Sequence, residues 1–388
     1  NNNVKVKFGS QGFTYTPPSG FKALSTKNLP VDTSIIRPQK HFDTILYTGT
    51  DTSAARTVTG LEFAPDLVWQ KRRNGTNWHT WHDSVRGVGK TLYSNDTSAE
   101  GTNNQYGYIS AFGTSGFTWS PGSTNNSDGN ESSGTFVSWC WKAGGAAVSN
   151  SDGSITSTIS ANQEAGFSIV TWTGTGSNST VGHGLGKAPK VVICKLRDTT
   201  TQDWFFMPGE ITGDRGKYIK FDTTDGVASD IHTFPPTATT STVFTVGGED
   251  GGNGSNGNGS KYVAYCWAEI PGYSKFDSYV GNGDADGQFV HLGFRPAWLL
   301  IRKLSGDHWI IKDSTRNTVN DVHSNLGANI NNAEFGSTGN VQSTDFLSNG
   351  FKLRGTDGAV NGGSSDYIYM AFAEQPGVTP FDTFPNAR

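Results

Sequence analysis

Three short apolar runs recur along the chain, and each follows a proline at the same spacing. In every copy a basic residue falls six positions after that proline. A run that is apolar at consecutive positions predicts a strand covered on both faces, so we expect these runs to be central strands. The runs are Leu67–Lys71, Val191–Lys195 and Trp298–Arg302.

A second set of three runs is rich in aromatic residues and closes each repeat. In the middle copy Tyr265 and Trp267 share one parity, whereas Ala264 and Cys266 share the other. Because side chains alternate between the two faces of a strand, this pattern predicts one face that packs inside a module and one that abuts a neighbour. The three runs are Phe136–Trp141, Tyr262–Trp267 and Tyr367–Phe372.

The spacing of these columns identifies an internal repeat. An aromatic residue two positions before a glycine recurs at Tyr47, Trp172 and Tyr279, and the other columns keep nearly the same offsets. A fixed period identifies the folding unit. We therefore predict an all-β fold of three tandem β-sandwich, jelly-roll-like modules over residues 36–147, 166–272 and 273–388, with an N-terminal segment 1–35 and a polar linker 148–165.

The composition agrees with short strands and many turns, and it reduces the classes of partner that we expect. The chain has 50 Gly among 388 residues and a net charge of −4, without a basic stripe, so we expect no nucleic acid partner. No apolar run reaches the length that spans a bilayer, so we expect no membrane insertion. Cys140, Cys194 and Cys266 are too few for a disulfide framework and are expected to be small buried hydrophobes.

Two copies share the pattern Asp-Ser-x-Arg. We expect Asp83 with Arg86, and Asp313 with Arg316, to form structural ion pairs that lock a turn, in preference to a substrate-binding role. The middle copy departs from the pattern and offers only Asp214-Arg215 at a shifted spacing. That departure argues against a catalytic function common to the modules.

Three tryptophans precede these turns and are candidates for stacking sugars. Trp78 and Trp309 both lie 13 residues after their proline, and Trp204 is the candidate in the middle copy. Counting back from Asp83 instead aligns His79 with Trp309, which predicts a bulge or a one-residue insertion between the columns. A place in the core remains the favoured alternative for all three, since tryptophan is highly buried on average.

No motif in the sequence supports catalysis, a cofactor or a metal. The segment His79–Asp83 lacks the converging ligands of a zinc site, and the acidic glycine loops 248–254 and 282–287 do not match calcium-loop spacing. Gly87–Thr91 resembles only the end of a phosphate-binding loop, and no nucleophile elbow occurs. We therefore expect no catalytic residues, no cofactor and no metal, although two carboxylates for glycoside hydrolysis could hide among 34 acids.

At these columns the chain resembles a family of repeat-bearing bacteriophage tail-fibre and virion structural proteins from marine phages. The stretches that carry the resemblance are Ser19–Pro30, Val137–Gly145, Ser348–Gly355 and Pro385–Arg388. The resemblance implies that residues before Pro30 end a SPRY-type domain, so that residue 1 would lie inside a longer polypeptide. It implies a setting and no chemistry, because it supplies no catalytic residues.

These observations lead to an expected function. We expect a non-enzymatic, extracellular virion protein, a tail fibre or related appendage, that assembles with identical chains, for example as a trimer, and with other virion proteins. Its expected external partner is a host-surface glycan or protein. The alternatives are a polysaccharide-degrading tailspike enzyme and a head-decorating fibre.

Overall fold

The structure of the chain is a computed structural model that describes residues 35–51, 53–198, 202–230, 233–248, 254–336 and 342–374. Apart from Ile35, the predicted N-terminal segment 1–35 lies outside the described residues. The described part is all-β, as predicted, and consists of several antiparallel sheets with two single-turn helices. The described residues form one compact unit.

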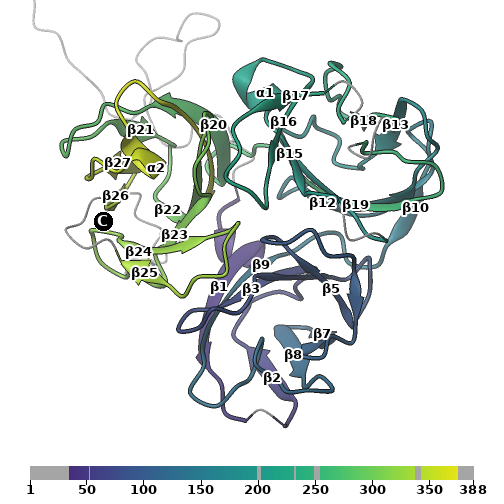
Figure 1. The fold of residues 1–388 in the computed structure, drawn as a ribbon, viewed down its shortest axis with the longest axis horizontal. Helices are drawn as coiled ribbons and strands as arrows, with labels where there is room; N and C mark the ends of the chain where they lie inside the picture. The colour runs from purple at the N-terminus through teal and green to yellow at the C-terminus, as the bar shows by residue number, and fades with distance from the viewer. Residues whose placement is uncertain are drawn as a thin grey trace, which may run out of the picture. The chain divides into compact units, whose positions relative to one another are not determined.

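The first predicted module contains one six-stranded main sheet and a three-stranded second sheet, coloured purple to blue in Figure 1. A short 3-10 helix, η2 (Pro38–Lys40), precedes the first strand. The main sheet has the order β1 (Phe42–Thr48), β9 (Thr135–Trp141), β3 (Leu67–Arg72), β4 (Thr80–Asp83), β5 (Lys90–Tyr93) and β6 (Gly101–Thr102), and the second sheet has the order β2 (Arg56–Thr59), β8 (Gly116–Ser120) and β7 (Tyr108–Gly113).

The second module has an eight-stranded main sheet and a two-stranded second sheet, coloured teal in Figure 1. Its helix is α1 (Gly209–Thr212). The main sheet has the order β10 (Val148–Asn150), β11 (Ser157–Asn162), β12 (Phe167–Thr173), β19 (Lys261–Trp267), β14 (Val191–Leu196), β15 (Phe205–Met207), β16 (Lys217–Lys220) and β17 (Ala228–Ser229), and the second sheet pairs β13 (Ser179–Gly182) with β18 (Val243–Val246).

The third module repeats the arrangement of the first in green to yellow. Its helix is α2 (Gly358–Asn361), which begins at an Asp357 side chain that accepts a hydrogen bond from the Ala359 backbone. The main sheet has the order β20 (Ser274–Val280), β28 (Asp366–Ala373), β22 (Pro296–Lys303), β23 (Ile310–Asp313), β24 (Ser324–Gly327) and β25 (Phe335–Gly336), and the second sheet has the order β21 (Phe289–His291), β27 (Gly350–Leu353) and β26 (Thr344–Leu347).

The predicted runs take the same place in all three main sheets. The closing strands β9, β19 and β28 lie between equivalent pairs of strands: β1 and β3, β12 and β14, and β20 and β22 respectively. One face of each main sheet packs against the second sheet of its own module, and Cys140, Cys194 and Cys266 are buried there. The expected sandwich layers are therefore present in each module.

The other faces of the three main sheets meet in one shared core. Trp139, Tyr265 and Met370 occupy the same position in the three closing strands, and all three belong to this core. Tyr265 and Trp267 face it, whereas Ala264 and Cys266 face the sandwich interior of the second module. The alternating pattern in the sequence therefore distinguishes two sets of side chains. One set packs in the core inside a module, and the other packs in the core that the three modules share.

The prediction that residues 148–165 form a linker is wrong. It contains β10 and β11, which extend the main sheet of the second module, and β11 pairs with β12 from Thr158 to Asn162. Ile155 and Ile159 are buried in that module's own core. The segment resembles a linker in composition because the buried residues Ser157 and Ser160 are polar, and their hydroxyls donate to backbone carbonyls.

Candidate functional site

A surface cavity of about 490 Å³ lies in the first module, where four loops and strand ends converge. The loop between β3 and β4 and the end of β5 form one side. The loops between β6 and β7 and between β8 and β9 form the other. This volume is within the range of small-molecule binding pockets. The lining residues are Thr76, Asn77, Trp78, Tyr93, Asn104, Gln105, Tyr106, Ser127 and Asp128.

Two exposed aromatic side chains form the apolar part of the cavity. Trp78 is 39% exposed and Tyr106 is 40% exposed, while Tyr93 is buried. The rings of Trp78 and Tyr93 pack edge to face, with centroids 4.9 Å apart at 80°. Tyr93 therefore supports Trp78 from within the module and leaves part of the indole open to a ligand.

The polar part of the cavity centres on Asp128. The Asn77 side-chain amide donates to the Asp128 Oδ1 atom at 2.9 Å and to the Ser127 carbonyl at 3.2 Å. The Asp128 backbone N–H donates to the Tyr106 carbonyl at 3.0 Å. Asp128 therefore connects the two sides of the cavity, through its side-chain bond with Asn77 and its backbone bond with Tyr106. Burial raises the pKa of the Asp128 carboxyl to about 6, although the bond from Asn77 and the nearby charges of Lys71 and Arg72 oppose this shift.

The loop that carries Tyr106 is held by its own polar residues. The Asn104 side chain accepts from the Tyr106 backbone at 2.7 Å, and the Gln105 carbonyl accepts from the backbones of Thr124 and Asn125 at 2.9 and 3.1 Å. Gly107 follows at a φ of +112°, where an added Cβ would meet the Trp119 indole nitrogen at 2.4 Å. The position therefore requires glycine.

This combination of groups suits a sugar ring. Partly exposed aromatic faces can pack against the apolar C–H face of a sugar, and amide, hydroxyl and carboxyl groups can bond its hydroxyls. Asp128 is the one carboxyl among the nine lining residues. Glycoside hydrolysis uses a pair of carboxyl groups, so the cavity as described offers binding chemistry without that pair.

The three tryptophans proposed for sugar stacking have different places. Trp78 lines the cavity. Trp204 and Trp309 are 0% and 1% exposed, so the favoured core position is confirmed for these two and their candidacy as ligand-facing residues is wrong. The residue directly before β4, β15 and β23 is His79, Trp204 and Trp309 respectively, which settles the alignment in favour of His79. Trp78 is therefore in a loop position that the other modules fill with Asp203 and His308.

Trp204 and Trp309 join neighbouring modules. The Trp204 indole donates to the Tyr93 carbonyl of the first module at 2.7 Å, and the Trp309 indole donates to the Lys220 carbonyl of the second at 3.1 Å. Tyr93 and Lys220 are the last residues of β5 and β16, which are equivalent strands. The indoles are buried because they make the same contact at successive junctions.

The two predicted Asp–Arg pairs are present, and they also lie at module junctions. Arg86 contacts Asp83, and the Arg316 Nε atom lies 2.5 Å from Asp313 Oδ2, with all four side chains buried. Each pair is extended by a glutamate and by an arginine from the next module: Glu100 with Arg197 in the first case, and Glu334 with Arg73 in the second.

The third junction replaces this polar set with apolar residues at equivalent positions. Backbone bonds link Glu100 to Arg197 and Glu334 to Arg73, and the matching bond here joins Val227 to Leu304 at 2.9 Å. Strand register places Pro208 where the other modules have Asp83 and Asp313. The charges are therefore absent as a group, so that none is buried without a partner.

The histidine-rich segment 79–83 also has a structural place. The His79 Nδ1 atom accepts a bond of 3.0 Å from the Trp69 indole, and the His82 ring bonds the Lys90 carbonyl at 3.0 Å. Burial holds the pKa of His79 well below its usual value and lowers that of His82 to about 3. Within the described residues, no cluster of three or more His, Cys, Asp or Glu side chains could hold a metal ion.

Sequence reasoning missed most of the cavity. It found Trp78 but not Tyr106, Asn104 or Asp128, because these residues come from loops that are distant in sequence. One usable signal was present: Trp78 follows the polar turn Asn74–Asn77 instead of lying inside a strand, where burial would be expected.

The fold and the cavity define an all-β protein of three modules around a shared core, with a small-molecule-sized cavity on the first module. The chain belongs to the family described as Domain of unknown function (DUF7483), which it matches over residues 37–376. No curated protein and no solved structure matches the chain. Among the helices of the described ranges, none has the length and apolar character needed to cross a bilayer.

Proposed function

We propose that this protein is a non-catalytic attachment protein that binds a host-surface glycan in the cavity of its first module. The observation that carries the proposal is the pairing of Trp78 and Tyr106, two of the three large aromatic side chains that are exposed in the described residues, in one cavity with polar neighbours. Exposed aromatics gathered at one polar pocket are a mark of a binding site.

The proposed setting is the surface of a bacteriophage virion, in a tail fibre or related appendage outside the cell. The sequence resemblance supports this setting, and so does a buried architecture whose repeated residues serve the junctions between modules. Binding by a single open cavity is expected to be weak. Assembly of identical chains, and attachment to other virion proteins, would therefore raise the overall avidity by presenting several cavities to one cell surface.

The test is binding of the purified protein to host envelope polysaccharide and to a panel of soluble oligosaccharides. Trp78→Ala and Tyr106→Ala should each weaken binding by at least about tenfold, which corresponds to about 1.4 kcal/mol. Phe289→Ala is the matched control, because Phe289 is 40% exposed but lies outside the cavity, and it should leave binding unchanged.

The same assay separates attachment from hydrolysis. A binding protein leaves the polysaccharide intact over prolonged incubation. Release of reducing ends that disappears in Asp128→Asn would contradict the proposal and would establish the tailspike enzyme instead. No binding to any envelope or oligosaccharide would also reject it.

A further inference from the structure

We infer that the cavity of the first module selects uncharged sugar residues and rejects acidic ones such as uronates. This inference rests on the proposed glycan binding and names the class of sugar that the site accepts. It depends on which charges line the cavity and on which nearby charges are already paired.

Among the described residues, the lining of the cavity contains no cationic side chain. Its nine residues include three amides, two tyrosines and one carboxyl, with no Lys, Arg or His. A ligand carboxylate is usually held by a positive charge or by several N–H donors directed at it. The cavity therefore lacks the partner that an acidic sugar would need.

The cations nearest to the cavity are engaged elsewhere. The Lys71 ammonium is buried and donates to the carbonyls of Arg72 and Gly75, both at 2.8 Å. Arg72 pairs with Glu131 and bonds the Asn74 side chain. A cationic side chain would have to leave one of these contacts before it could meet a bound ligand.

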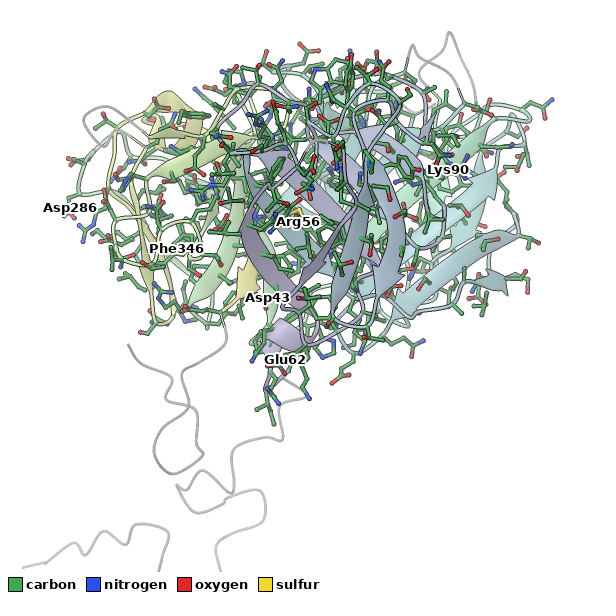
Figure 2. All side chains as sticks on the ribbon, turned by 90° about the horizontal axis from the view of Figure 1, so that it is seen from below. Asp43, Arg56, Glu62, Lys90, Asp286 and Phe346 are labelled. Carbon is green, nitrogen blue, oxygen red and sulfur yellow. The ribbon has the colours of Figure 1, made fainter. Side chains whose placement is uncertain are left out.

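The two labelled cations of this module in Figure 2 also have partners outside the cavity. Arg56 on β2 lies over the Tyr47 ring, and Lys90 at the start of β5 bonds the Thr102 hydroxyl. Neither residue lines the cavity. Neither of these two cations therefore supplies positive charge to the lining of the site.

The one charged group inside the site is negative. Asp128 is 6% exposed, so water screens its carboxylate poorly, and it lies between the Trp78 side and the Tyr106 side of the cavity. A carboxylate accepts hydrogen bonds from sugar hydroxyls but repels a second carboxylate placed beside it. Hydroxyl recognition and rejection of acids therefore come from the same side chain.

The experiment compares neutral and acidic sugars of the same stereochemistry. The probes are 1,4-linked digalactose with digalacturonate, and 1,4-linked dimannose with dimannuronate, measured by calorimetry or by tryptophan fluorescence on the full chain at pH 7.5 and low salt. For at least one pair, we expect the neutral sugar to bind at least tenfold more tightly than its uronate. Uronate binding equal to or tighter than neutral binding in both pairs would overturn the inference and leave glycan binding standing.

Asp128→Asn tests the residue that we hold responsible. It should reduce the preference for the neutral sugar to about threefold or less, whereas Asp51→Asn, at an exposed acid of the same module that does not line the cavity, should leave it unchanged. If Asp128→Asn does not fold, the native chain still gives an answer, because protonation of the Asp128 carboxyl at pH 5 should reduce the preference. A preference that neither change alters contradicts the inference. Failure of every neutral and acidic sugar to bind would instead reject the proposed function itself.

Discussion

The Tyr265 hydroxyl of the second module donates a 2.7 Å hydrogen bond to the Asp83 carboxylate of the first. The Trp139 indole makes the corresponding 3.1 Å bond to Asp313. At the third junction the donor position holds Met370 and the acceptor position holds Pro208. The hydrogen-bond donor and its acceptor are therefore absent together at this junction. This indicates that the residues on the two sides of each junction are matched to each other.

We predict that Tyr265→Phe lowers the free energy of unfolding by about 1–3 kcal/mol, because it leaves a buried carboxylate with one partner fewer. Urea unfolding followed by fluorescence would measure the change. Tyr108→Phe, at a half-buried position outside the junctions, should cost less than about 0.5 kcal/mol. Equal losses in the two variants would contradict a special role for the Tyr265 contact.

Substitutions of the tryptophans should fall into two groups according to how much they lower the free energy of unfolding. Trp309→Ala removes a buried side chain and its junction bond, and we expect a loss of about 3–5 kcal/mol. Trp78→Ala, at a partly exposed position, should cost about 1 kcal/mol or less while it impairs sugar binding. Thermal and urea unfolding of both variants would check this, and a severe loss in Trp78→Ala would identify that indole as structural.

Stability should rise with pH above neutrality because of buried lysines. Burial lowers the pKa of Lys71 and of Lys312 to about 7, whereas the unfolded value is about 10.5. Between these values the unfolded chain binds more protons than the folded chain, so the free energy of unfolding increases with pH. Each of the two lysines contributes roughly 2 kcal/mol over this range, so we expect an increase of about 3–4 kcal/mol from pH 7.5 to 9.

Lys312→Met should flatten that rise. Lys187→Met is the control, since Lys187 is exposed. The shifted pKa values of the buried carboxyls and histidines lie at or below about 7, and Lys195, with a pKa of about 8, adds to the rise in this window. A stability profile that stays flat in the native chain would show that both buried ammonium groups remain charged.

The preference for neutral sugars should weaken at acidic pH. Below its pKa of about 6 the Asp128 carboxyl is protonated and no longer repels a uronate, which itself stays ionised at pH 5. Lys71 and Arg72 on β3 and Tyr93 on β5 face this carboxyl. Lys71, whose pKa is about 7, gains positive charge between pH 7.5 and pH 5, which weakens the preference in the same direction. Repeating the paired calorimetry at pH 5 checks this, with the preference expected to fall by about threefold or more.

The sequence predicted the elements and their faces better than it predicted their assembly. The runs after each proline and the closing runs are strands in the expected positions, since alternation and apolar continuity are local signals. The shared core could not be predicted in detail, because Tyr265 signals only that some neighbour covers it. Likewise, the two strands in segment 148–165 form because β11 pairs with the edge of β12 that β19 leaves free. Composition does not reveal that edge.

The candidate site was predictable only in part, for a related reason. Trp78 stands out because it follows a polar turn, but Asp128 resembles any acid in a serine- and asparagine-rich loop. Its role depends on a position between loops that are separated by about 50 residues. The Asp–Arg pairs were predictable because both partners lie within one turn, whereas their extension by Arg197 and Arg73 crosses between modules.

The shared core has a consequence for synthesis on the ribosome. The inner face of the first module, with Trp69, Trp81 and Trp139, is complete more than 200 residues before the closing strand of the third module emerges. At bacterial or eukaryotic translation speeds that interval is roughly 10–45 s. During that time the nascent chain exposes an aromatic surface that must be protected from aggregation. A gene rearrangement that deletes or moves one module would leave this surface exposed in the finished protein.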